Sequence, residues 1–93
     1  MPYYQFEWHH AYSDEPISIY SEVDDDGWES RKVELFRDGS VGYADGARQR
    51  GTTGLAEVKF PSVEEIAVQP EFKPRLISRD EFEAVWKDAL ERP

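Results

Sequence analysis

The 93-residue sequence contains no cysteine, which excludes disulfide scaffolds, thiolate metal sites and cysteine nucleophiles. Positive charge is also scarce, because 11 Lys and Arg stand against 20 Asp and Glu, a formal net charge of −9. This deficit disfavours binding to nucleic acid and to anionic membranes, since both depend on Lys and Arg at the surface. The first residues lack the basic start and apolar run of a secretory signal, and nothing approaches the roughly 18 apolar residues of a membrane span. We therefore expect a cytoplasmic protein.

Aromatic residues, at 14%, supply enough bulky apolar surface for a small core, so we expect one folded domain over residues 1–93. In the first half, apolar residues recur at every second position, which predicts strands over 4–8, 17–23, 28–36 and 41–44. Two Asp-Gly pairs, Asp26-Gly27 and Asp38-Gly39, predict tight hairpin turns between them. The glycine-rich segment 45–54 predicts a mobile loop, functional or only flexible, and residues 55–60 allow a fifth strand.

The second half changes to a helical period. Ser62 and Ser78 each precede a Glu by three residues, the pattern of a helix N-terminus, and Pro70 to Pro74 is too rich in proline for a regular element. The C-terminal helix has an apolar stripe of Phe82, Val85, Trp86, Ala89 and Leu90. We predict an α+β fold: an antiparallel four- to five-stranded meander sheet packed on a C-terminal helix, with one additional short helix over 62–67. The sheet face that meets the helix is expected to carry Tyr4, Phe6, Trp8, Ile17 and Ile19.

Known catalytic and metal-binding patterns are weak in this sequence. Adjacent histidines on a strand point to opposite faces, so His9 and His10, with Asp14 and Glu15 nearby, better fit a polar strand-end loop than a metal site. The acidic run 24–26 lacks the alternate spacing of a calcium loop, and segment 46–53 lacks the lysine of a phosphate-binding loop. No serine lies in a nucleophile elbow. We therefore predict no catalytic, cofactor-binding or metal residues, no cofactor and no enzyme activity.

Several aromatic residues are left without an evident place beside the helix. Trp and Tyr next to charged residues are typical of interaction surfaces, although the same residues would also suit a second small core under segment 55–74. Two arginines make the loop 45–54 locally basic, and a carboxylate of a partner is a conceivable contact there. The predicted partner-binding residues are Tyr20, Trp28, Phe36, Tyr43, Arg48 and Arg50.

Short segments along the chain resemble a family of small acidic bacterial proteins known only as a domain of unknown function. The resemblance rests on residues 7–10, 14–16, 20–22, 31–34, 36–39 and the closing segment 77–86. It implies a stand-alone bacterial domain of about this length and brings no activity, ligand or catalytic residue.

The leading hypothesis is a small acidic protein-interaction module, immunity- or regulator-like, that binds another protein through its sheet face or a strand edge. Pairing of two copies through a sheet edge would give a homodimer. One alternative is a DNA-mimic inhibitor of a basic nucleic-acid enzyme, with carboxylates in place of phosphates at Asp24, Asp25, Asp26, Glu64 and Glu65. The other is a small metal-assisted enzyme that uses His9, His10, Asp14 and Glu15. Added salt separates the interaction module from the DNA mimic. Binding by mimicry depends on charge alone and should collapse with salt, whereas binding through an apolar face should survive it.

Overall fold

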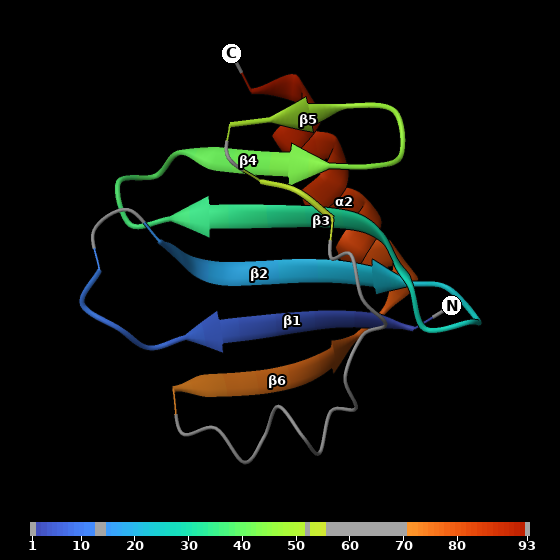
Figure 1. The fold of residues 1–93 in the computed structure, drawn as a ribbon, viewed down its shortest axis with the longest axis horizontal. Coiled ribbons are helices and arrows are strands. Elements are labelled where there is room, and N and C mark those ends of the chain that lie inside the picture. Colours follow the sequence, from blue (N-terminus) through green and yellow to red (C-terminus); the bar gives the residue numbers. More distant parts are fainter. Residues whose placement is uncertain (1, 13–14, 52, 56–70, 93) are drawn as a thin grey trace.

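The computed structural model describes residues 2–12, 15–51, 53–55 and 71–92. These residues form a six-stranded antiparallel sheet with one α-helix lying across one of its faces (Figure 1). The strands and the helix are β1 (Tyr3–Trp8), β2 (Pro16–Val23), β3 (Glu29–Phe36), β4 (Val41–Ala44), β5 (Gln49–Arg50), β6 (Phe72–Ile77) and α2 (Arg79–Glu91). Across the sheet their order is β5-β4-β3-β2-β1-β6, which confirms the α+β class.

The first four strands form the predicted meander. Each pairs antiparallel with the next, and the pattern of alternating apolar residues places them within a residue or so of the expected bounds. The turns lie at the two Asp-Gly pairs, where Gly27 and Gly39 have φ of 90° and 89°. Residues with a Cβ rarely adopt such angles, so glycine permits both tight connections.

Two strands were not predicted. β5 lies inside segment 45–54, which we expected to be a loop, because a strand of two polar residues leaves no apolar alternation in the sequence. β6 covers part of the proline-rich segment that we expected to be irregular. Pro74 has no N–H to donate, but β6 is the end strand of the described sheet and pairs only with β1, so the missing donor is tolerated there.

Other predictions fall outside the described residues. The short helix over 62–67 lies there, as does all of the expected strand 55–60 except Leu55. Within the described part of the chain, no helix is long and apolar enough to cross a membrane.

Helix α2 begins as predicted, at the capping residue Ser78. Its hydroxyl accepts a hydrogen bond from the backbone N–H of Glu81 at 3.1 Å, which satisfies one of the free N–H groups of the first turn. The apolar stripe of the helix then packs against the sheet. The resulting core consists of Tyr3, Val33, Val41, Ile77, Phe82, Trp86 and Ala89, with Phe82 fully buried.

The prediction of which sheet face meets the helix is wrong. Tyr3 of β1 lies in the helix-facing core, so strand alternation turns Tyr4, Phe6 and Trp8 to the opposite face. The register across the sheet aligns Tyr3 with Glu22, Tyr20 with Val33, and Val33 with Tyr43. The helix covers this face because β3 and β4 provide its apolar platform of Val33, Leu35, Val41 and Tyr43.

The opposite face is also partly buried, with Phe6, Val23 and Ala44 all shielded from solvent. Residues 53–55 cross this face over β4, where Gly42 leaves room for them. A Cβ at position 42 would overlap the Oγ1 of Thr53, which donates a hydrogen bond to the Glu34 carboxylate at 2.6 Å. The absence of a side chain at Gly42 therefore allows the chain to cross the sheet at this point.

Candidate functional site

The β2–β3 hairpin ends in a tight acidic turn formed by residues 24–28. The N–H of Asp24 donates to the Trp28 carbonyl at 2.8 Å, and the N–H of Gly27 donates to the Asp24 carbonyl at 3.0 Å. The side-chain Oδ1 of Asp24 accepts from the N–H groups of Asp26 at 2.9 Å and Trp28 at 2.8 Å. These hydrogen bonds, with the left-handed Gly27, fix the conformation of the turn.

Trp28 lies at the base of this turn with 42% of its surface exposed. Asp25 and Asp26 are exposed on the same turn, whereas Trp86 is buried in the core. Trp28, whose backbone N–H is held by the Asp24 carboxylate, combines the residue type most common in binding hot spots with the charge of the neighbouring turn. Of the six residues predicted to bind a partner, Trp28 is the one whose position best suits that role.

Two of the other predicted residues lie in the core. Tyr20 and Tyr43 pack against the helix-facing cluster, and the Tyr43 ring meets the edge of Trp86 with centroids 5.6 Å apart. The prediction that these tyrosines lie on the free sheet face is therefore wrong, because that face is the one α2 covers. Phe36 does lie on the opposite face, half-buried, but it is separated from Trp28 by the whole length of β3.

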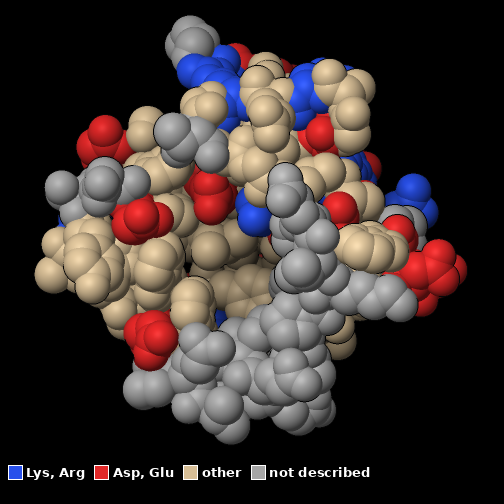
Figure 2. All heavy atoms as spheres, viewed as in Figure 1, with Lys and Arg blue, Asp and Glu red and all other residues tan. Residues whose placement is uncertain are grey.

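The two predicted arginines lie at the β5 edge, and Lys and Arg side chains are seen along that upper edge in Figure 2. Nε of Arg48 lies 3.3 Å from the Asp45 carboxylate, whose pKa is lowered by hydrogen bonds from the N–H groups of Ala47 and Arg48. Arg50 donates from Nη1 to the Arg92 carbonyl at 2.7 Å. Both arginines therefore also bind groups of this chain, and the structure does not bring them to Trp28.

The histidine cluster borders a shallow hollow of about 590 Å³ that is also lined by Gln5, Ser18 and Arg37. His10 is already occupied there: its Nδ1 accepts from the N–H of Tyr12 at 2.9 Å and its Nε2 lies 2.7 Å from the Pro16 carbonyl. His9 instead faces Glu7 at 3.5 Å. Among the described residues, which include Glu15 but not Asp14, no group of three or more His, Asp or Glu could hold a metal ion.

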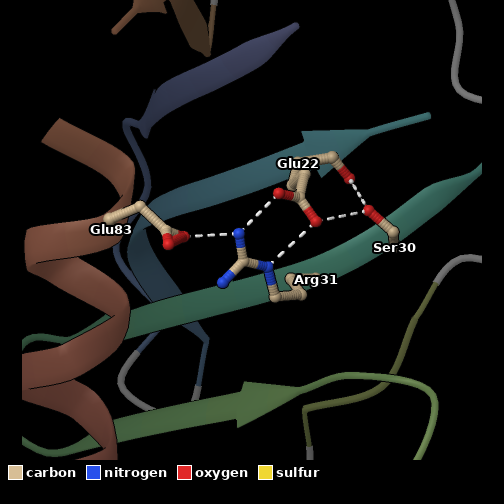
Figure 3. A network of polar contacts seen from close by, with 4 residues as sticks. All are labelled: Glu22, Ser30, Arg31 and Glu83. Carbon is tan, nitrogen blue, oxygen red and sulfur yellow. Dashed lines mark hydrogen bonds and ion pairs between the residues drawn. The ribbon is translucent and has the colours of Figure 1, made fainter. Parts of the chain in front are cut away.

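Sequence reasoning missed a polar network beneath the helix, shown in Figure 3. Arg31 of β3 donates from Nε and Nη2 to the two carboxylate oxygens of Glu22 on β2, at 2.9 and 2.5 Å. The same Nη2 lies 2.5 Å from the Glu83 carboxylate of α2. Ser30 donates a further hydrogen bond to Glu22 at 2.7 Å, so the Glu22 carboxylate is bound from two sides.

This network changes the acidity of its members. The guanidinium of Arg31, with help from Ser30, lowers the pKa of Glu22 to about 2 against the opposing effect of burial. The pKa of Arg31 is raised above its ordinary value, first by its hydrogen bonds to Glu22 and then by those to Glu83. Its guanidinium carbon also lies 4.9 Å from the ring centre of Phe82 and 5.3 Å from that of Trp86, so it stacks on the aromatic core as a cation. The network joins sheet and helix, and its Glu83 side chain is partly exposed.

A second buried polar cluster lies on the opposite face and was also missed. Ser21 donates to the Glu29 carboxylate at 2.7 Å, and Nζ of Lys32 lies 3.1 Å from the same carboxylate. Lys32 also donates to the Gly54 carbonyl at 3.1 Å. Both clusters depend on the cross-strand register of β2 and β3, which a sequence pattern of alternating residues does not specify.

A family model described as Domain of unknown function (DUF6881) matches residues 2–91 of the chain. No curated protein and no solved structure matches the chain.

Proposed function

We propose that this chain, which belongs to the family described as Domain of unknown function (DUF6881), is a small acidic cytoplasmic module that acts by binding another protein. The observation that carries the proposal is the distribution of charge. Many of the few basic residues are held in ion pairs within the molecule: Arg31 with Glu22 and Glu83, Lys32 with Glu29, Arg48 with Asp45, Arg75 with Glu81, and Arg92 with Asp88.

Acidic residues outnumber basic ones by 20 to 11 in this chain. Asp26, Asp80 and Glu91 are exposed and form no ion pair within the described part of the chain. Carboxylates are spread over the face seen in Figure 2, where basic groups lie mainly along the upper edge, with others near the centre and at the right. A surface of this sign attracts a partner with a basic surface and repels nucleic acid. The partner we propose is therefore a protein rich in surface Lys and Arg.

Capture of partners from the source organism tests this proposal. The purified chain is immobilised and exposed to nuclease-treated soluble protein, with immobilised poly-glutamate as the control for charge without a fold. We expect specific retention of basic proteins that the poly-glutamate matrix does not retain. Retention only of proteins that both matrices bind would contradict the proposal.

The same experiment separates an interaction module from a DNA mimic. Washing at ~0.5 M salt, where exposed charges are screened over a few ångströms, should weaken the binding of a module but leave a measurable part of it. Binding by charge mimicry would be lost almost completely and would be displaced by duplex DNA. We expect retention to persist in the presence of duplex DNA.

A further inference from the structure

Three large apolar side chains are exposed in the described part of the chain: Tyr12, Trp28, which is 42% exposed, and Leu76. Tyr12 is 63% exposed, and its ring already stacks on His10 with centroids 5.4 Å apart. Leu76 is 70% exposed on the end strand β6, directly before the helix-facing Ile77. Trp28 differs from both because it combines a large aromatic surface with a hydrogen-bonded turn and three neighbouring carboxylates.

Fixing a loop in advance lowers the entropy lost on binding. The Asp24 side chain holds the N–H groups of Asp26 and Trp28, and the Asp24 backbone binds Trp28 and Gly27. The position of the Trp28 backbone is therefore set before any partner arrives. An exposed indole on such a turn can enter an apolar pocket without reorganisation of the hairpin.

The charges of the turn define the partner. When the indole ring enters a pocket, the exposed carboxylate of Asp26 on the same turn approaches the rim and loses water. A rim without cations would leave this carboxylate poorly solvated, which is costly, whereas Lys or Arg at the rim would pair with it. A second copy of this chain is a poor occupant, since each copy carries a net charge of −9.

We infer that Trp28 is the anchor of the interaction, and that it inserts into an apolar pocket rimmed by Lys and Arg on the partner protein. This inference rests on the proposed function and adds to it the contact residue and the chemistry of the partner surface. The turn residues 24–26 supply the charge that orients the hairpin on this rim.

The three tryptophans allow a direct test by fluorine NMR after labelling with 5-fluorotryptophan. Trp8 and Trp86 act as internal references, and the Trp28 resonance is assigned from its absence in Trp28→Phe. The probes are two nuclease-treated fractions of soluble protein from the source organism, one bound by a cation exchanger and the other by an anion exchanger. We expect the cation-exchanger fraction to shift the Trp28 resonance while the anion-exchanger fraction leaves it unchanged.

Variants then measure the contribution of the anchor, with binding quantified against a basic protein purified from that fraction. Trp28→Ala should weaken binding about 30-fold, in the range of a hot-spot residue. Asp26→Asn should weaken it by a few-fold and reduce its salt dependence. Tyr12→Ala, the matched loss of an exposed aromatic residue, should leave it unchanged.

The outcomes separate failure of the inference from failure of the proposed function. If basic proteins bind but Trp28→Ala binds as tightly as the original chain, the anchor is wrong and the interaction module stands. If no protein of either fraction binds, both are wrong. A Trp28 resonance that shifts with the concentration of the chain itself would overturn the inference in favour of self-association.

Discussion

Arg31 of β3 and Glu83 of α2 form an ion pair at 2.5 Å, directly beside the pair that Arg31 makes with Glu22 of β2. One guanidinium therefore links two neighbouring strands to the helix that covers them. The side chain of Glu22 is only 8% exposed, so its charge depends on this arginine for compensation. Removing a single partner from such a buried pair is more damaging than replacing the whole pair.

Arg31→Met should accordingly destabilise the fold by about 3 kcal/mol, because it leaves the Glu22 carboxylate buried without a cation. Urea denaturation followed by circular dichroism measures this change. Arg79→Met is the matched control: Arg79 is exposed and forms no ion pair in the described part of the chain, so its loss should cost less than about 0.5 kcal/mol. Equal stability of the two variants would refute the proposed role of Arg31.

Glu83→Gln should have a smaller effect than Arg31→Met. Glu83 is partly exposed, and exposed ion pairs typically contribute less than about 1 kcal/mol. Arg31 also keeps Glu22 as a partner in this variant. A loss as large as that of Arg31→Met, in the same urea experiment, would mean that the contact with the helix rather than the pair within the sheet carries the stabilisation.

Stability should fall in acid because of Glu22. Its pKa is lowered from 4.5 to about 2 in the folded state, chiefly by Arg31, so the folded state favours the ionised form. The resulting stabilisation is fully present above pH 4.5 and is lost as the pH falls through about 2. A shift of this size corresponds to roughly 3 kcal/mol, and more than half of it should be gone at about pH 3.

Urea midpoints between pH 7 and about pH 3 test this dependence, with Glu22→Gln as the comparison. The variant should be less stable at neutral pH and should lose less of its remaining stability on acidification, because the titrating group is absent. Parallel curves for the two proteins would show that other carboxylates cause the acid sensitivity.

Gly42→Ala should disturb the crossing of residues 53–55 over β4. The added methyl group would overlap Thr53, which is itself buried, and overpacking of this kind typically costs about 1–3 kcal/mol. Gly46→Ala is the matched control, because a Cβ there meets no atom within 4 Å. Hydrogen exchange of residues 53–55 should accelerate in Gly42→Ala alone. Unchanged exchange would mean that this segment is not held by its fit over Gly42.

Zinc and manganese should give no binding heat in calorimetric titration of the chain. His10 uses Nδ1 to accept from Tyr12 and Nε2 to contact the Pro16 carbonyl, so metal binding would have to break these contacts. A stoichiometric heat that disappears in His10→Ala would overturn this prediction and restore the metal-assisted enzyme as a hypothesis.

Much of the fold could be predicted from the sequence because its signals are local. The Asp-Gly pairs set the hairpins, and Ser78 sets the start of the helix. The face covered by α2 could not be predicted, because β1 carries aromatic residues on both sides. Tyr3 lies on one side, and Tyr4 and Phe6 lie on the other. That choice depends on the combined pattern of β3 and β4, which only the register reveals.

The same dependence on strand register limited what the sequence could predict about the candidate site. The exposure of Trp28 agrees with its place beside the acidic turn, which is a local feature, and its role in binding stays a prediction. Tyr20 and Tyr43 were wrongly placed with it, because their positions follow from the face assignment. The pairing of Glu22 with Arg31 joins residues nine positions apart across a hairpin with a register shift beside Glu22, so spacing alone could not indicate it.

The position of β1 between β2 and β6 has a consequence for synthesis of the protein. On the ribosome, residues 3–44 emerge first and can pair as a meander, but one side of β1 has no partner strand until residues 72–77 have been translated. The helix that covers Tyr3 and Val33 follows immediately after them. The nascent chain therefore keeps an open edge on β1 and an uncovered apolar sheet face until residues 72–91 have left the exit tunnel, and chaperones can bind such surfaces in this interval.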